Sequence, residues 1–171
     1  LTQRRQMGGE GEAPPDLGKT IETFYNPLVK RLRSLELPIV GAINGVAAGA
    51  GMSLALACDI TLAARSATFL QAFAKIGLVP DSGSTFFLPR LVGDARARGL
   101  ALLAEKITAE QAESWGLIWM AVDDDKLMDE ATALPRHLAT QPPKALARIN
   151  QAHDASPTNS LGIQLDMERD L

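Results

Sequence analysis

The chain has 171 residues, a length that gives room for one domain with a sizeable hydrophobic core. A hydrophobic content of 46% and a charged content of 22% are ordinary for a globular protein in water. The net charge of -3 and the lack of a dense basic patch exclude a typical nucleic-acid partner, and no apolar run is long enough to cross a membrane. The single cysteine, Cys58, cannot form an internal disulfide, which fits a reducing, cytoplasmic location.

The sequence divides into three parts. Residues 1–15 are polar and rich in glycine and proline, and they predict a mobile loop or arm. Because the chain starts with Leu1 inside this segment, we expect a further portion of the protein upstream of it. Residues 16–125 predict the core of the fold, and residues 126–171 predict a helical region.

The first elements of the core predict a parallel sheet. Apolar residues over 20–33 recur every three or four positions, as on one face of an amphipathic helix, and Pro27 predicts a break or a late start of this helix. A short apolar strand follows over 39–44, then a turn of small residues, a helix over 52–58 and a second apolar strand over 60–64. A strand, a helix and a strand within so few residues predict a βαβ unit, whose strands lie parallel.

Beyond residue 66 the pattern becomes mainly helical. A short strand is expected at the edge of the sheet over 67–69, and turn-forming residues predict a loop over 77–84. Capped helices then begin at Asp94 and Thr108. The remaining predicted elements are a strand over 117–122, a helix from the cap at 123–125 to about residue 139 that is kinked or interrupted at Pro135, and helices over 143–155 and 161–171. The predicted fold class is α/β with a trailing helical region.

The turn at 45–51 (GVAAGAG) is the most informative stretch, because every residue from 47 to 51 lacks a side chain beyond Cβ. Such residues let a ligand approach the backbone closely, and the first N–H groups of the following helix have no partner within it. Together with the helix dipole, they predict a site for an anion or a developing oxyanion. A second interpretation is that small residues only let the helix pack closely on its strand. Nucleotide binding is the weaker hypothesis, since Leu54 stands where a dinucleotide fingerprint needs its third glycine.

Several separate motifs, in order, resemble the enoyl-CoA hydratase/isomerase (crotonase) family. They are the run 38–51 (PIVGAINGVAAGAG), the triplet 58–60 (CDI), the segment 75–80 (KIGLVP) and the later segments 107–112 (ITAEQA) and 115–118 (WGLI). The resemblance implies a ββα-repeat spiral core, whose N-terminal part is missing from this chain, and a C-terminal helical region used in trimerisation. It also implies an acyl-CoA thioester substrate, a homotrimer or dimer of trimers, and no metal or cofactor apart from the coenzyme A of the substrate.

The resemblance assigns the small-residue turn to the thioester oxygen. Two backbone N–H groups of the family bind this oxygen and stabilise an enolate; one matches Ala50, and the other is expected upstream of Leu1. The other positions that the resemblance implies in substrate binding are Ala48, Gly49, Gly51, Phe73, Gly77 and Pro80.

Three positions depart from the hydratases of the family. Hydratases carry two glutamates that handle the water, and Ser53 and Phe73 stand in their places here. The carboxylate that remains in the adjoining loop is Asp81, which we interpret as the acid/base; the alternative is a turn former that caps the next helix. Phe73, together with Phe69, is expected to form an apolar wall for a ring-bearing acyl group.

These departures favour an acyl-CoA isomerase, which moves a proton between carbons of a CoA-bound acyl chain. Two alternatives stay open: an enoyl-CoA hydratase with another water-positioning group, and a catalytically silent family member that binds acyl-CoA. Asp59 is expected to fix the backbone, because a buried carboxylate needs partners. The arginines are expected on solvated helix faces, where one could meet a coenzyme A phosphate; they are Arg31, Arg33, Arg96 and Arg98.

Overall fold

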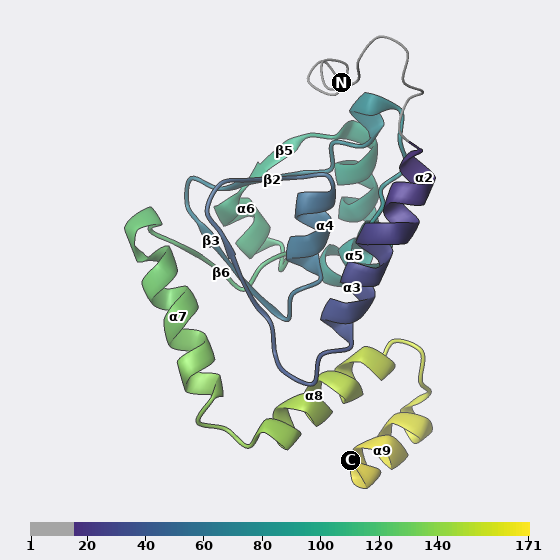
Figure 1. Cartoon of the computed structure of the whole chain (residues 1–171), viewed down its shortest axis with the longest axis vertical. Helices are drawn as coiled ribbons and strands as arrows, with labels where there is room; N and C mark the ends of the chain where they lie inside the picture. The colour runs from purple at the N-terminus through teal and green to yellow at the C-terminus, as the bar shows by residue number, and fades with distance from the viewer. Residues whose placement is uncertain (1–15) are drawn as a thin grey trace.

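The computed structural model describes residues 16–171, so the predicted arm over 1–15 lies outside the described residues. Two three-stranded sheets form the centre of this part of the chain, and helices lie on both sides of them (Figure 1). The largest fully buried side chains include those of Met52, Leu62 and Phe69. They come from a helix and from both sheets, so the two sheets share one hydrophobic core.

The first sheet contains the predicted βαβ unit. Strands β1 (Val40–Ile43), β3 (Ile60–Ala64) and β6 (Met120–Val122) lie parallel in the order β1-β3-β6. α4 (Ala50–Leu56) lies in the connection between β1 and β3. In β3 only the first residue, Ile60, is not buried, as expected for a strand that is covered on both faces. The prediction of a parallel pair is confirmed.

The second sheet differs from the prediction. Its strands are β2 (Val46–Ala48), β4 (Thr68–Leu70) and β5 (Lys106–Thr108), and β4 lies in the middle, parallel to β2 and antiparallel to β5. β2 thus occupies part of the predicted turn, β4 is not an edge strand, and β5 was not predicted. A strand of three residues is too short for an alternating pattern, so only its pairing partners define it.

The segment before the sheets is helical from residue 17 to residue 33. It consists of α2 (Leu17–Thr20), the π-helical turn η1 (Ile21–Tyr25) and α3 (Asn26–Arg33). The N–H of Asn26 donates to the carbonyl of Ile21, and this wider turn directly precedes Pro27, which has no N–H to donate. α3 begins beside Pro27, as predicted, but the proline changes the type of helix instead of breaking it.

Of the two middle helices, α6 (Ala109–Ser114) begins at its predicted cap, whereas α5 (Ser84–Leu103) begins ten residues before the predicted start at Asp94. α5 follows the short η2 (Ala74–Ile76) and is interrupted at Gly93, whose φ of 78° and ψ of 161° are not helical. Its second half therefore starts close to the predicted Asp94. α6 begins with a capping box, in which the side chains of Thr108 and Gln111 each accept the other residue's backbone N–H.

A helix on the other side of the first sheet completes the core. η3 (Asp124–Lys126) leads into α7 (Leu127–Leu138), which contacts β1 and β3 and adds the buried Leu127 to the core. A kink or an interruption was predicted at Pro135; α7 continues through Pro135 to its end, so the interruption does not occur. Packing on the sheet holds the helix together although one backbone hydrogen bond is lost at the proline.

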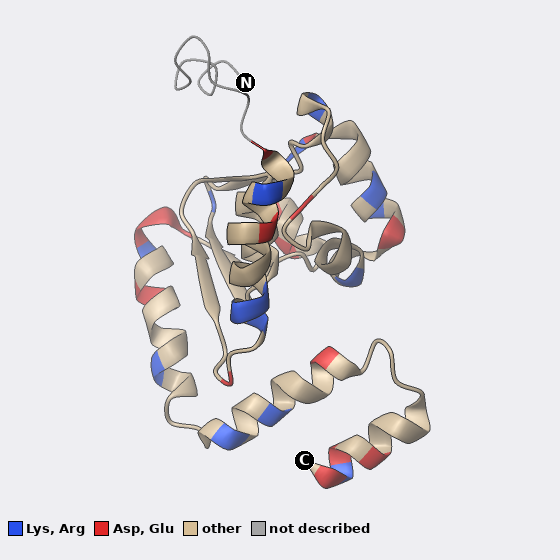
Figure 2. Ribbon diagram, turned by 45° about the vertical axis from the view of Figure 1, so that its right-hand side comes forward, with Lys and Arg blue, Asp and Glu red and all other residues tan. Residues whose placement is uncertain are grey.

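α8 (Pro143–Ala155) and α9 (Leu161–Asp170) extend away from the two sheets, and we call them together the C-terminal arm (Figures 1 and 2). Their bounds match the predicted ranges to within one residue. Within these two described helices no residue is buried, and large apolar side chains are exposed. Those side chains belong to Ile149, Leu161, Ile163 and Leu165.

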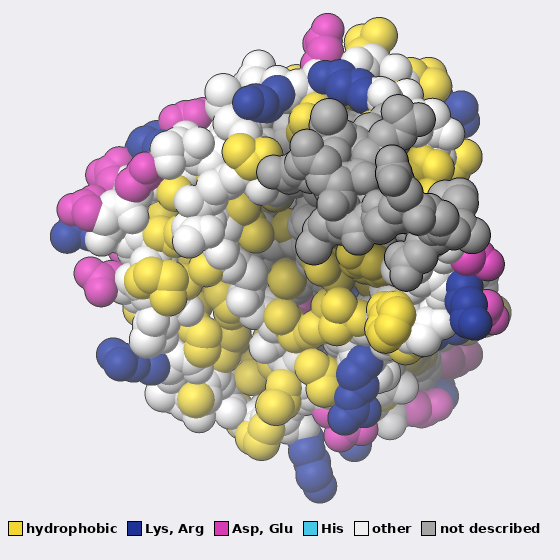
Figure 3. All heavy atoms as spheres, turned by 45° about the horizontal axis from the view of Figure 1, so that its top comes forward, with side chains coloured by type: hydrophobic (Ala, Val, Ile, Leu, Met, Phe, Trp, Pro, Cys, Tyr) yellow, Lys and Arg dark blue, Asp and Glu magenta, His cyan; other side chains and the backbone are white. Residues whose placement is uncertain are grey.

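Exposed apolar side chains also occur on the core. Figure 3 shows them distributed over the face that it presents, with most charged groups toward the rim of that face. No helix in residues 16–171 combines the length and the apolar character that a membrane span requires.

Candidate active site

The turn between β2 and α4 presents backbone donors to solvent. Gly49 has a φ of 55° and a ψ of -124°, a conformation that favours glycine, and its N–H donates to the Leu70 carbonyl at 2.9 Å. The chain therefore leaves the sheet abruptly and enters the helix at Ala50. Within residues 16–171 no acceptor is found for the N–H groups of Ala50 and Gly51. Ala50 is half-buried, while Gly51 and Ala48 are exposed, so the donors of this turn are accessible.

Phe73 lies against the same turn. A Cβ atom on Gly49 would be 3.7 Å from Cζ of the Phe73 ring, an ordinary van der Waals distance, so the ring lies directly beside Gly49. Phe73 is only 4% exposed, and its carbonyl accepts the N–H of Leu78 at 3.0 Å, beyond the left-handed Gly77 that ends η2. Phe73 thus lies beside this turn, and its role as an apolar wall for the acyl group stays a prediction. Phe69 belongs elsewhere, because it is completely buried in the core and pairs through β4 with both neighbouring strands.

Asp81 lies in the tight turn that leads into α5. Its carbonyl accepts the N–H of Ser84 at 3.0 Å, and the turn places both Ser82 (φ 55°) and Gly83 (φ 82°) in the left-handed region. The side chain of Asp81 is half-buried and accepts a hydrogen bond from the Ser82 hydroxyl at 2.8 Å. α5 has no side-chain cap, so the carboxylate of Asp81 does not perform the capping role that was the alternative to catalysis.

Ser53 joins these two parts of the site. It lies in the first turns of α4, is 0% exposed, and its hydroxyl is 3.0 Å from the Asp81 carbonyl and 3.3 Å from the Gly49 carbonyl. The helix that starts at Ala50 is therefore connected to the loop that carries Asp81. From the sequence, Ser53 was noticed only as the loss of a carboxylate, and Ser82 was not singled out. The pair Ser82-Gly83 directly after an aspartate was the signal for a tight turn.

Pro80 has a different environment from the other predicted substrate-binding residues. It is half-buried and lines a cavity of about 220 Å³ on the side of α5, together with Ser84, Leu88 and Ala97. Neither Ala50 nor Phe73 lines this cavity. The structure therefore brings Gly49, Ala50 and Phe73 together and links Asp81 to them through Ser53, whereas Pro80 lines a cavity that Ala50 and Phe73 do not line.

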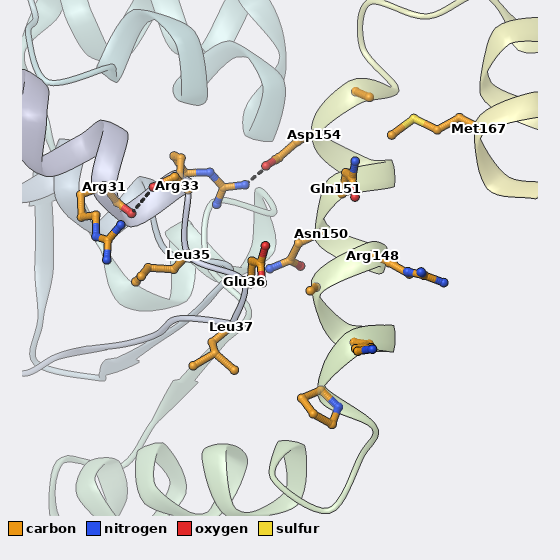
Figure 4. Close-up of a pocket in the computed structure, with 15 residues that line it drawn as sticks. Arg31, Arg33, Leu35, Glu36, Leu37, Arg148, Asn150, Gln151, Asp154 and Met167 are labelled. Carbon is orange, nitrogen blue, oxygen red and sulfur yellow. Dashed lines mark hydrogen bonds and ion pairs between the residues drawn. The ribbon is translucent and has the colours of Figure 1, made fainter. Parts of the chain in front are cut away.

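A larger groove lies at the C-terminal arm. It has a volume of about 1190 Å³ and runs between residues 31–37 and α8 (Figure 4). Arg33 crosses it: this side chain forms an ion pair with Asp154 of α8, and it also donates to Asp59 at 2.8 Å. Burial lowers the pKa of Arg33, but the two carboxylates outweigh this effect and raise it above its ordinary value. Arg33 is thus a half-buried structural residue, and the prediction of a solvated face is wrong for it.

The other charged and reactive residues near the core have structural partners. Asp59 accepts the N–H of Ile39 at 2.7 Å as well as the Arg33 guanidinium, which confirms that it fixes the backbone. Burial raises the pKa of the Cys58 thiol, and the negative charge of Asp59 adds to this effect. The thiolate is therefore disfavoured, and Cys58 is not an activated nucleophile.

Comparison with known proteins identifies the class of this chain. Residues 6–171 match the enoyl-CoA hydratase/isomerase family, and the chain belongs to this family. The crystal structure of an enoyl-CoA hydratase from Polaromonas sp. JS666 superposes with a TM-score of 0.89 at 34% identity, over 99% of this chain and 65% of that one. The fold is accordingly a crotonase fold with a helical C-terminal part.

Two curated relatives are more similar in sequence. The 1,2-epoxyphenylacetyl-CoA isomerase of Escherichia coli K12 is 58% identical over 166 residues, which cover 97% of this chain. A probable enoyl-CoA hydratase of Rhodobacter capsulatus is 48% identical over 164 residues, which cover 94% of this chain. The chain spans 63% of the length of each of these relatives.

Proposed function

We propose that this protein is an acyl-CoA isomerase that stabilises a thioester enolate, with 2-(1,2-epoxy-1,2-dihydrophenyl)acetyl-CoA of phenylacetate degradation as its substrate. One observation carries the proposal: Ser53 of the helix that starts at Ala50 holds the main chain of Asp81 beside that helix, and Asp81 supplies a carboxylate where Ser53 and Phe73 supply none. The 58% identity to the isomerase of Escherichia coli K12 supports the choice of substrate.

The proposed reaction uses the backbone and one side chain. The thioester oxygen accepts the N–H of Ala50, which stabilises the negative charge that develops on it when a proton leaves the adjacent carbon. Asp81 takes that proton and returns it at another carbon, so that substrate and product have the same atoms. Phe73 excludes water from one side of the acyl group. The reaction as written needs no resident metal or cofactor, because coenzyme A enters as part of the substrate.

Enoyl-CoA hydration is the second candidate, and the relative of Rhodobacter capsulatus favours it. A hydratase must position a water molecule, and the buried Phe73 and the hydroxyl of Ser53 offer no second carboxylate for this task. Crotonyl-CoA is the discriminating substrate. Rapid hydration of crotonyl-CoA would favour the hydratase, and tight binding of CoA thioesters without turnover of any would favour a catalytically silent member.

The proposal extends to the assembly and its location. The C-terminal arm exposes Ile149, Leu161, Ile163 and Leu165, an apolar surface that suits contact between subunits. We propose that the protein forms a homotrimer or a dimer of trimers in the cytoplasm. Light scattering coupled to size-exclusion chromatography measures the mass of the assembly, and a monomer at micromolar concentration would contradict it. Recovery of the protein in the membrane or periplasmic fraction of cells would contradict the location.

The replacement Asp81→Asn tests the proposed chemistry. It keeps the size of the side chain and removes the base, so we expect the turnover number for the epoxide substrate to fall by about 10²- to 10⁴-fold. Substrate loss is followed by chromatography, and uptake of deuterium from D2O at the carbon next to the thioester reports proton removal. Asp125→Asn, at an exposed position of η3, is the matched control. Turnover near that of the wild type in Asp81→Asn would refute the assignment.

A further inference from the structure

We propose that Ser53 is a positioning residue, which holds the main chain of Asp81 at a fixed place relative to the N–H of Ala50. The inference rests on the proposed function and deepens it, because it names the contact that makes the oxyanion turn and the acid/base loop one site. Ser53 itself touches no reacting atom in this scheme and acts through Asp81.

The contact of Ser53 with Asp81 is buried and directed. Ser53 is 0% exposed, and its hydroxyl has a single hydrogen to donate. The carbonyl of Asp81, at 3.0 Å, is the closer acceptor; the carbonyl of Gly49, at 3.3 Å, already accepts the backbone N–H of Ser53. A hydrogen bond in a dry interior is stronger than one in water, because no solvent competes for the donor.

A serine inside a helix commonly bonds to the carbonyl one turn earlier and then has no wider role. Here that carbonyl belongs to Gly49, and the longer distance disfavours it. Within residues 16–171 the Ser53 hydroxyl makes the one hydrogen bond between Asp81 and another element; the contacts of Asp81 with Ser82 and Ser84 lie inside its own turn.

The turn around Asp81 needs support from outside. Ser82 and Gly83 both have positive φ, and such a conformation persists in a non-glycine residue only when its surroundings impose it. Loss of the Ser53 contact would let the Asp81 loop move relative to α4. A shift of about 1 Å is enough to slow a reaction by up to about 10²-fold, although both groups are still present.

The replacement Ser53→Ala removes the hydroxyl and adds no bulk. We expect the turnover number for the epoxide substrate to fall about tenfold, with a change in KM below about twofold, because Asp81 moves while the binding turn stays intact. Ser84→Ala is the matched control. Ser84 is also a buried serine, only 1% exposed, but its hydroxyl has no partner among the described residues, and we expect no change in turnover.

A double-mutant cycle separates positioning from a merely structural role. If Ser53 acts through Asp81, then Ser53→Ala added to Asp81→Asn lowers the residual turnover no further. A further tenfold loss in the Asp81→Asn background would overturn the inference. Ser53→Cys, which nearly keeps the volume of the side chain but donates weakly, gives the same reading if Ser53→Ala fails to fold, and it should also lower turnover.

The two proposals fail in different ways. If Asp81→Asn abolishes turnover while Ser53→Ala and Ser53→Cys match Ser84→Ala, then the isomerase assignment stands and the role of Ser53 is wrong. If Asp81→Asn retains turnover, the proposed function itself is wrong. Thermal unfolding of every variant, followed by circular dichroism, shows whether a loss of turnover comes from loss of fold.

Discussion

The core and the C-terminal arm use helices in opposite ways. In the core, α4 contributes the completely buried Met52 and Ser53, and its start and its side chains shape the candidate site. In the arm, no residue of the described helices α8 and α9 is buried, and apolar side chains such as Leu165 face outward. A local pattern is thus enough to define a helix, but only burial gives it a large share of the stability. Arg33 connects the two regions through its contacts with Asp59 and Asp154.

The largest contrast is expected between two leucines. Leu62→Ala, at a completely buried position of β3, should lower the free energy of unfolding by about 2–5 kcal/mol, because it leaves a cavity in the shared core. Leu165→Ala, at a 57% exposed position of α9, should change it by less than about 0.5 kcal/mol in the isolated subunit. Chemical denaturation measures both. An equal effect of the two replacements would show that the arm is part of the cooperative core.

A charged replacement of Leu165 tests whether the arm serves assembly. Leu165→Asp places a charge on the apolar surface of the arm and should reduce the mass of the proposed trimer in light scattering. If the mass falls while the unfolding of the core is unchanged, then the arm serves assembly rather than folding.

Replacing each of two glycines with alanine is expected to change stability by smaller amounts and in opposite directions. In the site, Gly83 has a φ of 82°, and a Cβ there would be 2.6 Å from Cε2 of Phe87. Gly83→Ala should therefore cost about 1–3 kcal/mol of stability and also disturb the Asp81 loop. In the arm, Gly162 lies in helical α9 with nothing within 4 Å, so Gly162→Ala should stabilise that helix by about 0.5 kcal/mol. Thermal unfolding compares them, and a neutral Gly83→Ala would contradict the geometry of this turn.

A modest effect is expected where the two regions meet. Arg33→Ala removes the ion pairs with Asp59 and Asp154 and should cost about 1 kcal/mol, because Asp59 is largely buried and loses a partner. Hydrogen exchange should become faster in α8 and remain slow in β3. Arg169→Ala is the control, since its ion pairs with Asp166 and Asp170 are exposed and contribute little. Unchanged exchange in α8 would show that Arg33 does not hold the arm.

Much of the fold follows from patterns that neighbouring residues carry. β3 and α8 have the predicted bounds, because a continuous apolar run and a proline at a helix start are local signals. β2 and β5 escaped prediction, since three residues each acquire their identity from pairing with β4. Pro135 was predicted to kink or interrupt a helix, and packing on the sheet keeps α7 continuous through it.

For the candidate site, the sequence by itself determined the chemistry available: small residues around Ala50, an aspartate at 81, and no carboxylate at 53 or 73. Only the tertiary structure decided how these groups are joined. It shows that Ser53, which the sequence marked only as a missing glutamate, donates to the Asp81 carbonyl. It also shows that Phe69 is buried in the core, whereas Phe73 lies beside the turn. The physical reason is that residue types follow from local composition, whereas a hydrogen bond between residues 28 positions apart exists only after packing has brought α4 and the loop together.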